Sequence, residues 1–258
     1  MSEIRHDLPS TALCRHTNDA IWYRDKNLVD DILGKETFTT AAITHILGRT
    51  LDENQMAMLD AVLICLMEHG LTPSAISARL IYMSSPESFQ AGVAAGLLGV
   101  GSAFIGTMEN CAVLLEQIAM SPDAAITAAT IANQHIQEKK ACPGFGHHLH
   151  QPDDPRATAL LDMARIKGIS GKYIAALMIL SSELDEARGK RHLTINATGA
   201  IAAILCELNI PSEAMRGVAI IARAAGLVAH LVEEQRDPNG RIIWQLVDQA
   251  AGQNPPKR

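Results

Sequence analysis

The sequence predicts an all-α protein made of closely packed helices. Hydrophobic residues make up 48% of the 258 residues, which is enough to bury a sizeable core. Aromatic residues make up only 3%, so Ala, Leu and Ile must fill that core, and small side chains let helices approach one another closely. No alternating run of β-branched residues is long enough for a buried strand. We expect one large domain or a large and a small domain, because this length is near the upper limit for a single core.

Apolar periodicity and capping signals predict the helices in order. Residues 1–35 are polar and are expected to form an arm with short helices. Asp237 to Gly240 has the composition of a turn, and the tail from Gly252 is expected to be disordered. The expected helices cover 37–47 before Gly48, 52–69 with Asp52 as N-cap and Gly70 as stop, a segment opened by Thr72-Pro73, a segment from Ser85-Pro86-Glu87 to about Leu98, a segment from Ser121-Pro122-Asp123 to about Lys140, a segment from Asp153-Asp154-Pro155 through Ile166, and the runs 171–186, 196–208 and 212–234.

Charge and cysteine content restrict the partners and the compartment. The formal net charge is −6, from 22 Lys and Arg against 28 Asp and Glu, which disfavours nucleic acid and anionic membranes as partners. The five cysteines are scattered and form no CxxC pair, which favours reduced thiols in the cytoplasm. No secretory signal is visible in the first ten residues, and the longest apolar stretch, 91–105, is too short for a membrane span.

Residues 92–106 contain five glycines, and two interpretations are open. The glycines can mark places where helices pack closely. Alternatively, a helix break can expose backbone N–H groups that bind an anion. A dinucleotide-binding loop is disfavoured, because the sequence offers no βαβ context.

The segment from Cys142 to Arg156, CPGFGHHLHQPDDPR, has the residues of an anion-binding loop. Glycines flank Phe145 and favour a tight, non-helical turn. His147 near a helix start can donate a hydrogen bond or move a proton, and Arg156 can hold a carboxylate through two hydrogen bonds. Lys140 lies just upstream, where it can face phosphates. A solvent-exposed histidine-rich loop is the alternative, and a metal site on His148 and His150 is disfavoured because no acidic third ligand stands at helical spacing.

Arg223 points to an anionic ligand independently of that segment. It lies on an apolar predicted helix, and the positions four residues away are Ala219 and Leu227. A buried arginine needs an anionic partner, so a ligand carboxylate is expected. His230, on the same helix, has a helix-packing role as its simpler interpretation.

The segment from Cys142 to Arg156 resembles the citrate synthase loop GFGH-x-V-x-x-x-x-DPR and the GIGHR of the carboxyl-terminal module of ATP-citrate lyase, including the spacing from His147 to Arg156. Three other segments of the same superfamily agree in chain order, so the resemblance covers about residues 37–245. They are Met67 to Ala75 with His69, Ala94 to Gly106, and Ala222 to His230 with the following Glu233-Glu234-Gln235.

The resemblance implies a role for each matched residue. His147 would stabilise the alkoxide that develops on the oxaloacetate carbonyl, His69 would contact the oxaloacetate side of the ligand, and Arg156 and Arg223 would bind carboxylates. The loop Gly144, Phe145 and Gly146, together with Lys140, would bind coenzyme A. A coenzyme A thioester would be the substrate, with no covalently bound cofactor and no metal.

Two departures bear on the reaction. Phe104 occupies the position of the synthase histidine that stabilises the enolic acetyl-CoA; the ATP-citrate lyase module also has Phe there, which favours the lyase branch. Thr198, in Asn196-Ala197-Thr198-Gly199, occupies the position of the catalytic Asp of NVDG. Threonine does not titrate at neutral pH, and a positioned acid or base contributes roughly 10²–10⁴-fold to a rate. Thr198 as an ordinary helix N-cap is the simpler interpretation, and His192 is a candidate substitute for the missing acid.

A third departure concerns coenzyme A. Gln151 replaces a basic residue that some members have near coenzyme A, which weakens the coenzyme A prediction.

The resemblance also implies a two-domain homodimer. The large helical domain would contain 1–105 and 206–258, with the arm at about 1–35, and the small helical domain would contain 106–205 and close over the substrate. Arg236 or Arg241 would reach the partner subunit's site.

Three functional hypotheses follow. The first is a citryl-CoA lyase-like carbon–carbon lyase that cleaves or forms a citryl-CoA-type thioester, giving acetyl-CoA and oxaloacetate. The second is a superfamily member that binds a polycarboxylate or acyl-CoA without turnover. A purely structural helical protein is the weakest, because it leaves the matching polar positions unexplained.

Overall fold

The computed structural model describes residues 10–101, 106–147 and 149–253. Phe104 and His148 lie outside the described residues. The chain divides into two compact units, residues 1–57 and 58–258. The division into a large domain of 1–105 and 206–258 and a small domain of 106–205 stays a prediction.

The first unit contains a small antiparallel sheet where an arm with short helices was expected. Thr17 closes the first turn by donating its N–H to the carbonyl of Ala20 (2.8 Å), and Arg24 adopts a left-handed conformation (φ 52°) in the second. The prediction was wrong here because these short strands are mostly exposed, so they lack the long apolar alternation that marks a buried strand. The elements are β1 (Cys14–His16), β2 (Ile21–Tyr23) and β3 (Lys26–Asn27), in the order β1-β2-β3, followed by the π-helical turn η1 (Leu28–Ile32) and α1 (Phe38–Leu47), which ends at a left-handed Gly48 as predicted.

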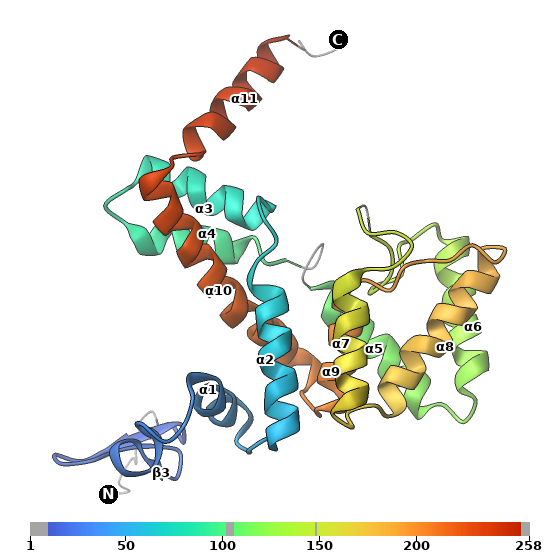
Figure 1. Cartoon of the computed structure of the whole chain (residues 1–258), viewed down its shortest axis with the longest axis horizontal. Helices are drawn as coiled ribbons and strands as arrows, with labels where there is room; N and C mark the ends of the chain where they lie inside the picture. Colours follow the sequence, from blue (N-terminus) through green and yellow to red (C-terminus); the bar gives the residue numbers. More distant parts are fainter. Residues whose placement is uncertain (1–9, 102–105, 148, 254–258) are drawn as a thin grey trace, which may run out of the picture. The chain divides into compact units, whose positions relative to one another are not determined.

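The second unit consists of packed α-helices, which confirms the all-α prediction for most of the chain (Figure 1). α2 runs into it from the first unit. α3 and α4 lie side by side and both contact α10, while α9 contacts α5, α7 and α8. The helices are α2 (Glu53–Met67), α3 (Pro73–Ser84), α4 (Phe89–Leu98), α5 (Thr107–Met120), α6 (Ala124–Gln137), α7 (Pro155–Ile166), α8 (Lys172–Ala187), α9 (Ala197–Glu207), α10 (Ser212–Arg236) and α11 (Gly240–Gln253).

Most predicted helix starts are correct, because the capping side chains bond as their sequence context indicates. Thr72, Asp123 and Asp154 each accept a backbone N–H at the start of α3, α6 and α7, and Pro follows Thr72 and Asp154 at the first helical position. The start expected at Ser85 is wrong. The N–H of Ser85 bonds to the carbonyl of Ile81 (3.0 Å) and closes α3, so α4 begins only at Phe89. α11 was not predicted as a helix.

The glycines of α4 are sites of close helix packing. A Cβ at Gly92 would lie 2.8 Å from Leu231 Cδ1, and a Cβ at Gly96 would lie 2.7 Å from Leu227 Cδ1, both on α10. The close-packing interpretation is therefore confirmed for these two positions. Residues 102–105, where the helix break was expected, lie outside the described residues.

α10 crosses the second unit and carries several site residues. Among the described residues it is the one helix that is long and apolar enough to cross a membrane, by length and composition only. The buried core helix of a protein passes the same test. α10 buries Arg223, His230 and Glu234, and it contacts α3, α4, α5 and α9.

Glu207, at the end of α9, caps the start of α8. Its Oε1 accepts the N–H groups of Gly171 (2.9 Å), Tyr173 (2.8 Å) and Ile174 (2.9 Å), and Gly171 has no side chain that could do so. We expect Glu207→Ala to lower the free energy of unfolding by about 1–2 kcal/mol, because these donors at the positive end of the helix dipole lose their acceptor. Chemical denaturation measures the effect. Glu207→Gln keeps an acceptor oxygen and should lose clearly less; equal losses would contradict the capping role.

Candidate active site

A cavity of about 1040 Å³ lies within the second unit, where several polar groups meet. The end of α2, the start of α3, the start of α5, the loop before α7, the starts of α7 and α9, and the middle of α10 all contribute. It is lined by Cys65, Leu66, His69, Leu71, Thr72, Pro73, Ser74, Gly99, Thr107, Asn110, Ala141, Cys142, Pro143, Gly144, Phe145, Gly146, His147, Leu149, Arg156, Asn196, Ala197, Thr198 and Arg223. Eight of the predicted site residues therefore lie around one cavity: His69, Gly144, Phe145, Gly146, His147, Arg156, Thr198 and Arg223.

The loop that carries His147 is held by backbone pairing with the segment before α9. The N–H of Gly146 donates to the carbonyl of Thr194 (2.7 Å), and the N–H of Asn196 donates to the carbonyl of Gly144 (3.1 Å). Gly144 and Gly146 both have left-handed backbones (φ 87° and 81°), which glycine adopts at little cost. A Cβ on Gly199 would lie 2.3 Å from the carbonyl oxygen of Gly144. The two segments thus approach as closely as glycine permits, which places His147 beside the start of α9.

The hydrogen bonds of His147 define its tautomer. Its Nδ1 accepts the backbone N–H groups of Leu149 (3.1 Å) and His150 (3.0 Å). A nitrogen that accepts two hydrogen bonds carries no proton, so the proton of the neutral ring is on Nε2. The ring of His150 packs against that of His147, with 4.4 Å between centroids. His147 therefore presents an N–H donor through Nε2.

Asp154 holds Arg156 in place. The carboxylate, fully buried, accepts hydrogen bonds from Arg156 Nε (3.0 Å) and Nη2 (2.8 Å), and also from the backbone N–H of Ala197 at the start of α9 (3.0 Å). Burial alone would raise the pKa of Asp154, but the hydrogen bonds and charge of Arg156 and the N–H of Ala197 outweigh it and lower the pKa. The ionised carboxylate thus joins α7 to α9. Sequence analysis identified Asp154 only as a helix cap.

Three donors converge beside this ion pair. Arg156 Nη2 lies 3.2 Å from His147 Nε2, and Arg156 Nη1 lies 3.3 Å from His69 Nδ1. A guanidinium carries only donors, and His147 Nε2 also carries a proton, so the contact between Arg156 and His147 joins two donors. An anionic oxygen placed between them would accept from both. The geometry is suited to a carboxylate or an alkoxide.

Arg223 extends this positive region from α10. The side chain is buried, and neither its Nε nor its Nη1 has a hydrogen-bond partner. Burial lowers the pKa of Arg223, and the charge of Glu68 partly offsets this effect. A buried guanidinium with unmade hydrogen bonds is costly unless an anion binds it. The expectation that Arg223 awaits a ligand carboxylate is consistent with this arrangement.

Thr198 lines the cavity but does not cap α9. Asn196 is the N-cap, since its Oδ1 accepts the N–H of Gly199 (3.1 Å), so the capping interpretation of Thr198 was wrong. The Thr198 hydroxyl donates to Asn196 Oδ1 (2.7 Å) and lies 3.2 Å from the hydroxyl of Thr107. The position of the expected acid is therefore occupied by a neutral hydroxyl whose proton is donated to Asn196.

Other predicted residues lie away from the cavity or outside the described residues. Lys140 is exposed, forms an ion pair with Glu138 (2.7 Å) and does not line the cavity; its proposed role toward coenzyme A stays a prediction. Phe104 lies outside the described residues. Cys142 lines the cavity, but burial raises the pKa of its thiol to about 12, so it is not a nucleophile at neutral pH. Among residues 10–101, 106–147 and 149–253, no group of three or more His, Cys, Asp or Glu side chains is arranged to hold a metal ion.

His192 does not substitute for the missing acid. Its Nδ1 lies 2.9 Å from Asp185 and its Nε2 lies 3.2 Å from Asp153, and it does not line the cavity. The hydrogen bond to Asp185 raises the pKa of His192, and the charge of Asp185 and the contributions of Asp153 add to it; together they outweigh burial, which lowers the pKa. His192 therefore joins the loop before α7 to the end of α8.

The raised pKa of His192 gives a pH-dependent contribution to stability. Protonation is favoured in the folded state, so the contribution is complete below the ordinary histidine pKa of about 6.5 and is lost as the pH rises through the raised pKa. We expect His192→Gln to lower the free energy of unfolding by less than about 1 kcal/mol at about pH 6, because all three side chains of the two ion pairs are partly exposed to solvent. The difference from wild type should shrink toward about pH 9 in urea titrations; a difference independent of pH would contradict the ion pairs.

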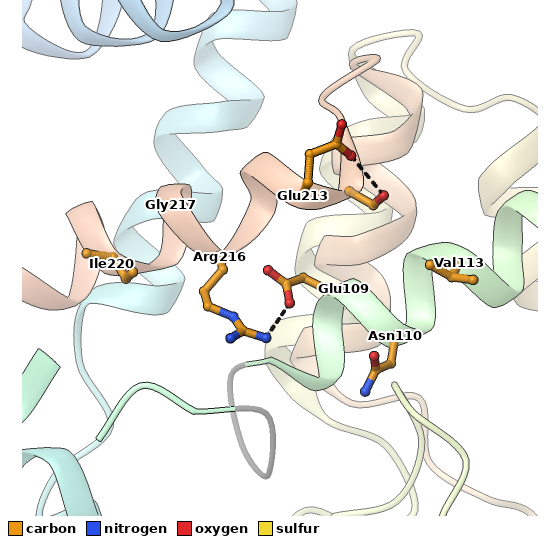
Figure 2. Close-up of a pocket in the computed structure, with 8 residues that line it drawn as sticks. Glu109, Asn110, Val113, Glu213, Arg216, Gly217 and Ile220 are labelled. Atoms are coloured by element: carbon orange, nitrogen blue, oxygen red, sulfur yellow. Dashed lines mark hydrogen bonds and ion pairs between the residues drawn. The ribbon is translucent and has the colours of Figure 1, made fainter. Parts of the chain in front are cut away.

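A second hollow of about 590 Å³ lies between the starts of α5 and α10 (Figure 2). Arg216 of α10 forms an ion pair with Glu109 of α5, and Asn110 lines both this hollow and the main cavity. Sequence analysis singled out none of these residues. The ion pair joins the two helices beside the main cavity.

Comparisons with known proteins agree with the family resemblance found in the sequence. Residues 12–244 match the family model described as "Citrate synthase, C-terminal domain". The protein described as "Putative citrate synthase 2" of Mycobacterium tuberculosis is 28% identical over 208 residues, covering 78% of this chain and 53% of that protein. The chain thus spans about half the length of the curated relatives it matches.

Two solved structures are similar over most of the chain. Citryl-CoA lyase from Hydrogenobacter thermophilus has a TM-score of 0.80 and 32% identity, and the match covers 88% of this chain and 87% of that one. ATP citrate lyase from Methanothrix soehngenii, in complex with citrate and coenzyme A, has a TM-score of 0.75 and 18% identity, covering 89% of this chain and 39% of that one. The second likeness shows the fold alone.

Proposed function

Because the chain belongs to the citrate synthase family, we propose that it is a citryl-CoA lyase-like carbon–carbon lyase, which cleaves a citryl-CoA-type thioester to acetyl-CoA and oxaloacetate or catalyses the reverse reaction. The observation that carries the proposal is the convergence of His69, His147, Arg156 and Arg223 on one cavity. The likeness to citryl-CoA lyase from Hydrogenobacter thermophilus over most of both chains supports the lyase direction within the family.

The proposed reaction uses these groups on the oxaloacetate half. The tertiary hydroxyl of the thioester passes its proton to solvent, and the bond from its carbon to the carbon beside the thioester breaks. The oxygen becomes the carbonyl of oxaloacetate, and the bonding electron pair passes into the thioester enolate, which takes a proton at carbon to give acetyl-CoA. The Nε2–H of His147 and the guanidinium of Arg156 stabilise charge on the oxygen. Arg156 and Arg223 bind the carboxylates.

The cavity offers fewer catalytic groups to the acetyl half of the substrate. Its enolate needs a proton donor, and Thr198 stands where the family has Asp. The Thr198 hydroxyl donates to Asn196 and does not titrate near neutral pH. This observation favours a second candidate function, a family member that binds a polycarboxylate or an acyl-CoA without turnover. The oxaloacetate half of the site would be the same in both.

We further propose that the loop of Gly144, Phe145 and Gly146, with Lys140, contacts coenzyme A, and that the protein is a cytoplasmic homodimer. Arg236 or Arg241 would then complete the partner subunit's site. The loop lines the cavity, which supports the first part. Light scattering on the purified chain tests the dimer.

Two measurements separate the candidate functions. Oxaloacetate release from citryl-CoA is followed with malate dehydrogenase and NADH, and oxaloacetate and coenzyme A binding are followed by calorimetry. Turnover by wild type eliminates the binding-only function. Binding without turnover eliminates the lyase. Arg223→Leu should weaken oxaloacetate binding roughly 10- to 100-fold, since a hydrogen-bonded charge is lost; Arg216→Leu, in the second hollow, is the matched control. Absence of both binding and turnover eliminates both functions.

A further inference from the structure

A buried polar network joins α3, α10 and the start of α11. Arg79, on α3, has a side chain only 1% exposed, and His230 and Glu234 of α10 are buried beside it. Arg79 Nη1 bonds to Glu234 (2.6 Å), and its Nη2 pairs with Glu233. Glu234 also accepts the backbone N–H of Gly240 at the start of α11 (2.7 Å). The network therefore joins three helices, and His230 connects it to Glu68, which bonds to the backbone of the cavity residue His69.

His230 transmits the orientation of Arg79 to Glu68. Arg79 donates from Nε (3.2 Å) and Nη2 (2.8 Å) to Nδ1 of His230. Because Nδ1 accepts, the ring proton lies on Nε2, which donates to a carboxylate oxygen of Glu68 at 3.1 Å. Arg79 thereby selects the tautomer in which His230 holds Glu68.

Glu68 lies between the network and the cavity. It follows the last residue of α2, and its carboxylate also accepts the backbone N–H groups of His69 (2.8 Å) and Gly70. Burial alone would raise the pKa of Glu68, but these hydrogen bonds and His230 lower it, so the group is ionised. The same carboxylate holds the backbone of His69, a residue that lines the cavity.

Glu68 is also the anion whose charge acts on Arg223. Its charge favours the protonated guanidinium, yet Arg223 Nε and Nη1 have no hydrogen-bond partner. A Cβ on Gly226, between Arg223 and His230 in α10, would lie 3.2 Å from Glu68 Oε2, so the carboxylate packs against this stretch of the helix. Glu68 is near Arg223, but its acceptors are directed to His230 and to its own backbone.

We propose that His230 is a positioning residue that keeps the Glu68 carboxylate turned away from Arg223, so that the guanidinium remains available to a carboxylate of the substrate. Arg79 supports it by fixing the tautomer. The inference rests on the proposed function, in which Arg223 binds a substrate carboxylate. Without the Nε2–H of His230, Glu68 is free to pair with Arg223 and to compete with the ligand.

The test is a double-mutant cycle on oxaloacetate affinity, measured by calorimetry on the full chain. His230→Leu should weaken oxaloacetate binding roughly 10- to 100-fold. Glu68 would then pair with Arg223, and the hydrogen bond from Arg223 to the ligand carboxylate would be lost. Glu68→Gln in the His230→Leu background should restore at least part of that loss, since the competing charge is gone. His230→Gln, whose amide can donate to Glu68 and accept from Arg79, should remain close to wild type.

The controls separate positioning from structural damage. Gln235→Leu removes a different hydrogen bond between α10 and α3, from Gln235 Nε2 to the Tyr82 hydroxyl (2.9 Å), and should leave oxaloacetate affinity unchanged. If His230→Leu does not fold, His230→Asn replaces it in the same cycle, because the shorter amide does not span both partners. A loss that Glu68→Gln fails to restore overturns the proposal. Wild-type affinity in the His230 variant also overturns it and leaves the proposed function intact, whereas no oxaloacetate binding by wild type overturns both.

Discussion

His147→Ala is expected to lower the rate of citryl-CoA cleavage about 100- to 1000-fold, the effect of removing one donor from an oxyanion site. The ring presents its Nε2–H toward the same point as Arg156, because its Nδ1 accepts the N–H groups of Leu149 and His150. This donor would act on the hydroxyl oxygen, which carries negative charge as an alkoxide before the carbon–carbon bond breaks. The loss should therefore appear mainly in kcat, measured by steady-state oxaloacetate release.

The matched control variant His135→Ala tests whether the loss of rate is specific to the site. His135, on α6, bonds to the carbonyl of Ile131 in its own helix (2.9 Å) and does not line the cavity. His135→Ala should leave kcat close to the wild-type value. A His147→Ala enzyme that retains wild-type kcat would contradict the role of His147 as a hydrogen-bond donor to the substrate oxygen.

Thr198→Asp is expected to raise the cleavage rate by up to roughly 10²–10⁴-fold, the usual contribution of a positioned acid or base. The position lines the cavity at the start of α9, where the N–H groups of the first helical turn favour a carboxylate. The enolate carbon of the acetyl fragment would gain a titrating proton donor. Oxaloacetate affinity should change little, since the oxaloacetate half of the site is untouched.

Thr198→Asn is the control for this gain, because it matches Asp in shape and does not titrate. A rate increase in both variants would point to altered packing near Thr107. An increase confined to Thr198→Asp, with a pH profile that follows one carboxyl group, supports the acid–base interpretation. A cleavage rate lower in Thr198→Asp than in wild type would contradict the assignment of Thr198 to the position of the family's catalytic Asp.

Local signals predicted most of the fold. Thr72-Pro73 and Asp154-Pro155 locate the starts of α3 and α7 because the capping bond and the proline both act within one turn. The sheet of the first unit escaped detection because its strands have two or three residues each. α11 was missed because Asn239-Gly240 looks like a turn, although the buried Glu234 accepts the first N–H of that helix.

Part of the site was likewise predictable from local sequence, and part was not. Cys142 to Arg156 is one continuous segment, so its residue types and spacing were enough to predict an anion-binding loop. The network of Arg79, His230 and Glu68 depends on contacts between residues about 150 positions apart in the chain, which no local pattern contains. One signal was available. Arg79, like Arg223, lies on an apolar helix with no acidic residue four positions away.

The most direct test of the central claim is the rate at which the purified wild-type chain releases oxaloacetate from citryl-CoA. We expect turnover that depends on His147 and rises when Thr198 is replaced by aspartate. Tight oxaloacetate binding with no release of product by wild type, or by Thr198→Asp, would contradict the claim that this cavity cleaves a citryl-CoA-type thioester.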